Sequence, residues 1–101
     1  MIRVMLADDQ KILAEGIRSV LDTCPDIEVC GVACDGVAAV EMAKTLKPDV
    51  ILMDVRMPEM NGVAATKRIK ESDPGIKIII LTTFDDSDYI LSGINNGASG
   101  Y

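Results

Sequence analysis

Three aspartates and one threonine stand where chemistry could occur, because they lie at the ends of short apolar runs of the chain. These residues are Asp8, Asp9, Asp54 and Thr82. A carboxylate at the end of a buried strand costs free energy unless a hydrogen bond or an opposite charge compensates it. If the fold brings the three acids together, they repel one another, so either some hold a proton or a cation binds among them.

The available ligand atoms indicate which cation would fit. The chain has no histidine, and its three cysteines, Cys24, Cys30 and Cys34, form no C-x-x-C pair, which argues against zinc and favours free thiols. An all-oxygen site suits a hard ion, and a small cluster with room for water and phosphate suits Mg²⁺ better than a full Ca²⁺ cage. Such a cation also lets a carboxylate accept a phosphoryl group, with the Thr82 hydroxyl near a phosphoryl oxygen.

The elements that must position these residues alternate along the chain. Short aliphatic runs predict strands, and the stretches between them place apolar residues at helical spacing. Asp35 is a plausible N-cap for the second helix. The expected strands are residues 2–7, 27–34, 49–54 and 76–82; the expected helices are residues 13–21, 35–46, 62–72 and 85–97; and residues 98–101 approach a fifth strand.

Strands that are apolar on both faces need helices over both faces, which predicts an α/β fold with a doubly wound, mostly parallel sheet. In such a sheet, ligands bind beyond the carboxyl ends of the strands, at the point where the strand order reverses. The strands ending at Asp8, Asp54 and Thr82 would therefore deliver their side chains to one crevice.

Composition bounds the function further. The chain has 101 residues, room for one domain, and a formal net charge of -6, which argues against a nucleic-acid surface on this segment. No apolar run approaches the roughly 20 residues of a membrane span, and the N-terminus lacks the layout of a signal peptide. We therefore expect a cytoplasmic protein without a membrane partner.

Four stretches, "LADDQ", "ILMDVRMPEMNG", "IIILTTF" and "NGASGY", resemble the receiver domain of two-component response regulators. The stretches "LADDQKILAEGIRSVL" and "GASGY" are most similar to the NarL/FixJ group, whose full-length members carry a LuxR-type helix-turn-helix after a linker. The resemblance implies a CheY-like fold with strand order 2-1-3-4-5. It also implies a role for each site residue: Asp54 as phosphoacceptor, Asp8 and Asp9 as the acidic pair, the backbone carbonyl of Arg56 as a further Mg²⁺ ligand, Thr82 as switch hydroxyl and Tyr101 as switch aromatic.

The resemblance also implies binding partners, and it shows where this sequence differs from the family. A sensor histidine kinase would donate the phosphoryl group, phosphorylation would promote homodimers, and DNA would be bound only by a domain beyond residue 101. The family's phosphate-binding Lys stands three residues past the position of Tyr101, followed by a final helix. We therefore expect residues 1–101 to be a receiver domain lacking most of strand five and helix five, with impaired phosphotransfer. Such a domain would either associate through its exposed sheet edge or be the ordered part of a longer chain.

Simpler interpretations stay open at this stage. Asp8 and Asp9 could cap the first helix, Asp54 could be a turn residue, Thr82 a plain strand residue and Tyr101 an edge aromatic. A stand-alone receiver that acts only by docking is an alternative function. An Mg²⁺-dependent aspartyl-nucleophile phosphatase is a weaker one, because its D-x-D pattern is absent here. The expected role is that of a phosphoacceptor with at most autophosphatase activity, not an enzyme.

Overall fold

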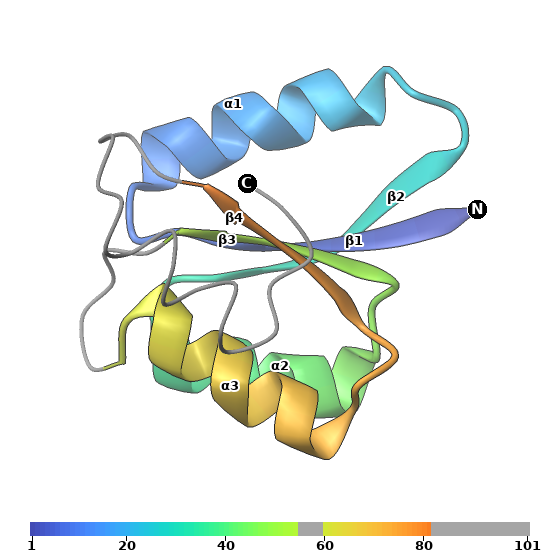
Figure 1. Cartoon of the computed structure of the whole chain (residues 1–101). Helices are drawn as coiled ribbons and strands as arrows, with labels where there is room; N and C mark the ends of the chain where they lie inside the picture. Colours follow the sequence, from blue (N-terminus) through green and yellow to red (C-terminus); the bar gives the residue numbers. More distant parts are fainter. Residues whose placement is uncertain (55–59, 82–101) are drawn as a thin grey trace.

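The chain folds around a four-stranded parallel sheet, seen here in a computed structural model that describes residues 1–54 and 60–81. The strands are β1 (Ile2–Ala7), β2 (Ile27–Ala33), β3 (Val50–Asp54) and β4 (Lys77–Leu81), in the order β2-β1-β3-β4 (Figure 1). This confirms the predicted parallel α/β sheet and the first four positions of its strand order. The expected helix 85–97 and fifth strand lie outside the described residues.

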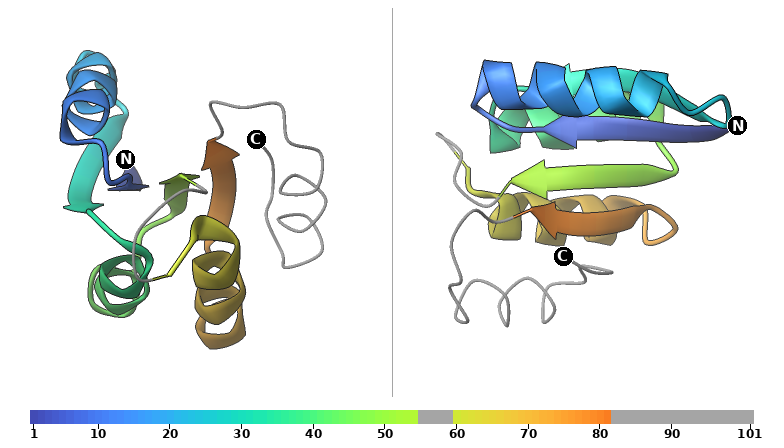
Figure 2. Two further views of the ribbon diagram at one scale, coloured as in Figure 1. Left: turned by 90° about the vertical axis from the view of Figure 1, so that its left-hand side faces the viewer. Right: turned by 90° about the horizontal axis from the view of Figure 1, so that it is seen from above.

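Three helices connect these strands and cover the sheet on two sides. They are α1 (Lys11–Asp22), α2 (Gly36–Leu46) and α3 (Gly62–Ser72). Figure 2 shows α1 on one face of the sheet and α2 beside α3 on the other. Each connection carries the chain from the carboxyl end of one strand back to the end of the sheet where the next strand begins, as parallel strands require. The doubly wound arrangement expected from the sequence is therefore present.

Two of these helices begin at a side chain that satisfies a backbone donor. The Asp35 carboxylate accepts a hydrogen bond from the Ala38 backbone N–H at 2.7 Å, which confirms the predicted N-cap of α2. Asn61 accepts from the Ala64 N–H at 2.9 Å and caps α3 in the same way. The first-turn N–H groups of a helix have no partner within the helix, so these caps fix where α2 and α3 begin.

The two faces of the sheet are packed to different extents. The face under α2 and α3 is closed, and its strand residues have no exposed surface: Ile51, Met53, Ile78 and Ile80. On the α1 side, Val4 and Leu6 of the inner strand β1 are buried as well. The residues of β3 and β4 on that side are only half-buried: Val50, Leu52, Ile79 and Leu81. On α1 itself Ala14 is buried, whereas Ile12 is 88% exposed and Val20 is 66% exposed. The main hydrophobic core therefore lies between the sheet and the α2–α3 pair.

None of the helices in the described part of the chain is both long enough and apolar enough to cross a membrane.

Candidate functional site

The carboxyl ends of β1 and β3 lie next to each other at one edge of the sheet. Ala7 at the end of β1 is paired in register with Met53 of β3. The residues that follow this pair, Asp8 and Asp54, therefore leave the sheet side by side. On the other side of β3, Asp54 is paired with Leu81, the last residue of β4.

Asp8, Asp9 and Asp54 form an acidic cluster at this edge. One carboxylate oxygen from each residue lies within 4.8 Å of the other two. Asp8 is buried, with 4% of its surface exposed, whereas Asp9 is exposed and Asp54 is half-buried. Carboxylates this close repel one another, and solvent screens the repulsion most at the exposed Asp9. The fold holds the three carboxylates close together despite this repulsion, and a bound cation would offset it.

The donor set of the acidic cluster fits a hard divalent cation. Its ligand atoms are carboxylate oxygens, which Mg²⁺ and Ca²⁺ prefer over the nitrogen and sulfur ligands of zinc sites. The graded exposure leaves one side open to solvent, so that water can complete the coordination. The residues present therefore match the requirements of a cation site that keeps open positions.

Asp8 is held in place by its neighbours in the fold. Its backbone N–H donates to the Ala33 carbonyl at the end of β2, at 3.0 Å. Its Oδ1 atom accepts a hydrogen bond from the Gln10 backbone N–H at 2.8 Å. The N-cap of α1 is Gln10, which makes no side-chain cap bond. The helix-cap interpretation of Asp8 and Asp9 is therefore wrong in detail, although Asp8 does tie down the residue before the helix.

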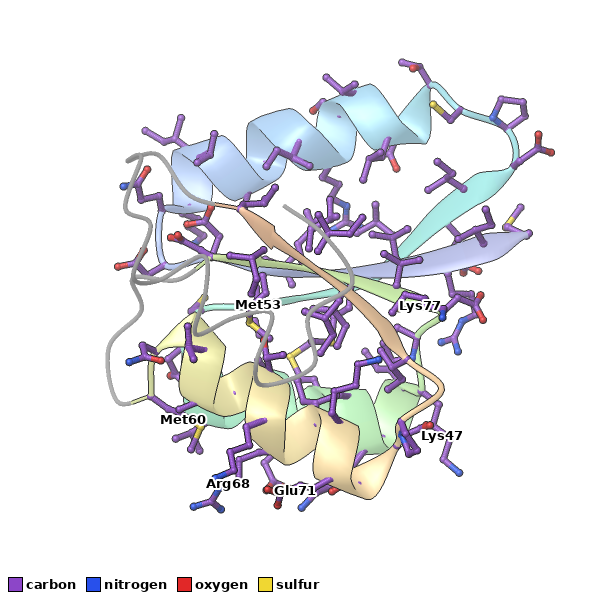
Figure 3. The ribbon with its side chains drawn as sticks, viewed as in Figure 1. Lys47, Met53, Met60, Arg68, Glu71 and Lys77 are labelled. Carbon is purple, nitrogen blue, oxygen red and sulfur yellow. The ribbon has the colours of Figure 1, made fainter. Side chains whose placement is uncertain are left out.

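The backbone of Asp54 is fixed by the start of α3. A Cβ atom built on Gly62 would lie 2.1 Å from the Asp54 carbonyl oxygen, closer than real Cβ atoms come to any oxygen. The α3 N-terminus can therefore approach Asp54 only because residue 62 has no side chain. Beneath it, the Met53 side chain is buried between the sheet and the helices (Figure 3).

A second glycine contact near the site was not recognised in the sequence. Gly36, the first residue of α2, packs directly on the backbone of Met60, the residue that precedes the α3 cap. The sequence signal was an Asp-Gly pair between a strand and a helix, which indicated only a helix start. Figure 3 shows Met60 beside the first turn of α3.

A hollow of about 220 Å³ opens beside Asp8, between α1 and the end of β2. Lys11 and Arg18 of α1 and the exposed Cys34 lie on its wall. The hollow joins the buried carboxylate to the outer surface of α1.

The described residues contain three of the six residues predicted for the site. The structure brings Asp8, Asp9 and Asp54 together, as the layout of the strands predicted. Arg56, Thr82 and Tyr101 lie outside the described residues, so their roles remain predictions.

The fold and the acidic cluster define a class of protein, and sequence comparison identifies the same class. Residues 4–101 match the response regulator receiver domain family. The chain therefore belongs to the response regulator receiver domains, which confirms the resemblance inferred from its four motifs.

Individual relatives place the chain near the NarL and LuxR-type regulators. It is 51% identical over 100 residues to the uncharacterized transcriptional regulatory protein YxjL of Bacillus subtilis, covering 99% of this chain and 46% of that protein. Among solved structures, it is similar to a LuxR-family two-component response regulator from Aurantimonas, with a TM-score of 0.93 and 34% identity over 98% of this chain and 71% of that one. The receiver domain of NarL from Mycobacterium tuberculosis matches with a TM-score of 0.93 and 30% identity, over 98% of this chain and 80% of that one.

The chain spans less than half the length of YxjL. What the complete relatives do therefore applies to this chain only as a proposal.

Proposed function

We propose that this domain is the phosphoacceptor of a two-component system, in which Asp54 accepts a phosphoryl group from a sensor histidine kinase with Mg²⁺. The acidic cluster carries this proposal, because three carboxylates whose oxygens lie within 4.8 Å of one another at the carboxyl ends of parallel strands could hold a cation. A clustered carboxylate becomes a useful nucleophile when a cation offsets the charge around it.

The transfer step is a displacement at phosphorus. An Asp54 carboxylate oxygen forms a bond to phosphorus while the bond between phosphorus and the kinase histidine nitrogen breaks. The imidazole leaves with the electron pair of that bond and takes up a proton. Phosphoryl transfer needs little covalent chemistry from the protein beyond positioning and charge stabilisation, so the geometry of the acidic cluster is the main requirement.

Asp8, Asp9 and Asp54 would hold the Mg²⁺ through their carboxylates, and the Arg56 backbone carbonyl would add a fourth ligand. The bound ion would offset negative charge on the transferring phosphoryl oxygens. Asp8 is already fixed by its bonds to Ala33 and Gln10, so the cation would enter a partly preorganised site.

The response to phosphorylation would begin next to Asp54. The phosphoryl group adds close to two negative charges, and the Thr82 hydroxyl would move toward it as a hydrogen-bond donor. Thr82 directly follows Leu81, which pairs with Asp54 in register. Tyr101 would then repack and change the surface that forms homodimers, as receiver domains generally do.

We infer that the output lies in a DNA-binding domain that is not part of these 101 residues. YxjL is named as a transcriptional regulatory protein, and this chain matches 46% of it. A helix-turn-helix domain following the receiver would fit that length, and the whole protein would act in the cytoplasm. A stand-alone receiver that acts by docking would share the same phosphoryl chemistry but have no such domain.

The decisive experiment is to treat the protein with Mg²⁺ and acetyl phosphate and to measure its intact mass. We expect one phosphoryl group on the wild-type protein and none on Asp54→Asn, whose amide is a poor nucleophile. Asp49→Asn is the matched control, since it removes a charge from the other end of the same segment. Equal modification of the Asp54→Asn variant would show that the acceptor is elsewhere.

A further inference from the structure

Gly36 makes an unusually close contact with the segment that leads away from Asp54. A Cβ atom built on Gly36 would lie 1.9 Å from the Met60 carbonyl oxygen and 2.6 Å from its Cβ atom. Real Cβ atoms essentially never come within 3.0 Å of another heavy atom, so any side chain at residue 36 would push Met60 outward by about 1 Å. The neighbouring atoms belong mainly to the backbone of Met60, which cannot rotate away as a flexible side chain can.

This contact is the first of three that connect α2 to Asp54. Met60 is followed by Asn61, whose side chain caps α3 through the Ala64 N–H. The next residue, Gly62, lies against the Asp54 carbonyl. The backbone of residues 60–62 is therefore held between α2 on one side and the phosphoacceptor residue on the other.

We propose that Gly36 is a positioning residue for the acidic cluster: its lack of a side chain sets the depth of the 60–62 backbone and thereby the placement of the Asp54 carboxylate relative to Asp8 and Asp9. The inference rests on the proposed function. Gly36 has no side chain and is 18 residues away from Asp54 in the sequence, so it can influence the acidic cluster only through packing.

A small displacement at this point has a large effect on metal binding. Mg²⁺ demands near-ideal octahedral geometry at about 2.0–2.1 Å from each ligand, so a ligand moved by a substantial part of 1 Å is lost or strained. Residues that only orient metal ligands typically change metal affinity by about 10- to 100-fold when they are replaced. We expect Gly36→Ala to weaken Mg²⁺ binding about tenfold or more.

Gly31 provides the control for a purely structural effect. A Cβ atom at Gly31 would also be crowded, lying 2.7 Å from Leu46 Cδ1 and 2.7 Å from Met42 Cε. Those atoms are the ends of flexible side chains, which can move aside more easily than backbone atoms can. Gly31→Ala should therefore lower the free energy of unfolding while leaving the Mg²⁺ dissociation constant within about twofold of wild type.

Gly62→Ala and Gly16→Ala complete the series. The first introduces a clash directly on Asp54 and should weaken Mg²⁺ binding at least as much as Gly36→Ala. The second places a methyl group where no heavy atom lies within 4 Å, in the middle of α1, and should change neither the fold nor the metal affinity.

The experiment measures Mg²⁺ affinity by isothermal titration calorimetry for the whole chain and each variant, with thermal unfolding followed by circular dichroism. The metal-free carboxyl ¹³C shift of Asp54 is recorded by NMR. The proposal expects Gly36→Ala to raise the dissociation constant about tenfold or more and to move the Asp54 shift, whereas Gly31→Ala does neither. A folded Gly36→Ala variant that binds Mg²⁺ within twofold of wild type overturns it, as does an equal loss in Gly31→Ala.

Two further outcomes are also decisive. If Gly36→Ala does not fold, Met60→Gly tests the same contact from its other side, because it removes the Met60 Cβ atom and frees the backbone there. An unchanged dissociation constant in Met60→Gly then overturns the proposal. If the wild-type chain itself binds no Mg²⁺, the proposed function fails, and this result is distinct from a wild type that binds and a Gly36 variant that is unaffected.

Discussion

The segment of residues 49–54 begins and ends with an aspartate, and the two occupy opposite environments. Asp49 lies at the amino end of the sheet, where its Oδ2 atom accepts a hydrogen bond from the Arg3 backbone N–H at 2.8 Å. Its own backbone N–H donates to the Arg3 carbonyl at 2.9 Å, and its carbonyl accepts from the Lys77 N–H at 3.1 Å. Asp54, at the carboxyl end, lies instead among two further carboxylates.

Three basic residues lie at the same end of the sheet as Asp49. The Arg3 guanidinium donates to the Leu46 carbonyl at the end of α2, close to Asp49. Lys47 and Lys77 lie at this amino end of the sheet as well (Figure 3). Asp49 is therefore held by hydrogen bonds next to positively charged residues, whereas Asp54 shares its end of the sheet with two other aspartates. Asp49 therefore joins backbone groups of neighbouring strands, whereas Asp54 contributes a carboxylate to the acidic cluster.

The strongest test of this comparison is the response of stability to Mg²⁺. A ligand that binds only the folded state stabilises it by about 2.7 kcal/mol at a concentration 100 times its dissociation constant. We expect the wild-type protein to gain stability of this order with Mg²⁺, and Asp9→Asn to lose most of the gain at the same concentration. Urea unfolding with Mg²⁺ and with EDTA measures both.

The control for this test is Asp49→Asn, which removes the same charge but keeps an oxygen acceptor for the Arg3 N–H. It should retain the full Mg²⁺ response. A reduced response in Asp49→Asn would mean that the metal effect is a general property of the negative charge of the chain, and the comparison between the two ends would fail.

A smaller effect is expected from removing the Asp49 acceptor altogether. Asp49→Ala leaves the Arg3 N–H without its side-chain partner, and a hydrogen bond of this kind contributes about 1 kcal/mol. The free energy of unfolding should fall by that amount equally with Mg²⁺ and with EDTA. A loss seen only with Mg²⁺ would instead assign Asp49 a role in the metal site.

The smallest effect concerns charge repulsion in the acidic cluster without metal. Asp9 is exposed, so solvent screens its repulsion by Asp8 and Asp54. Asp9→Asn should raise the free energy of unfolding in EDTA by about 0.5 kcal/mol, and the gain should shrink as salt is added. Destabilisation of Asp9→Asn in EDTA would show that the carboxylate makes a structural contact that outweighs the repulsion.

Much of the fold was predictable because the strands are short and aliphatic. The expected strand 2–7 matches β1 fully, and the other three strands differ from the structure only at their terminal residues. The convergence of Asp8, Asp9 and Asp54 followed from a general rule, that parallel strands present their carboxyl ends at one edge. Neither step required knowledge of side-chain contacts between distant elements.

The unequal packing of the two sheet faces was not predictable in this way. The α1 helix has apolar residues at helical spacing, yet Ile12 and Val20 are mostly exposed. Their exposure depends on how the helix is placed on the sheet, which the spacing does not determine. The contacts of Gly36 with Met60 and of Asp49 with Arg3 depend likewise on the position of whole elements. Residue type and spacing contain no signal for such contacts.

The sequence by itself determined that three acids end two strands, because local apolar patterns fix strands and the acids follow them directly. Only the tertiary structure decided that Asp8 is 4% exposed whereas its neighbour Asp9 is open to solvent, and that their oxygens lie within 4.8 Å of Asp54. The reason is physical: the order of residues sets which groups reach an edge of the sheet, but distances and burial there depend on how closely helices and strands pack. At Asp54 this close packing is possible because residue 62 is a glycine.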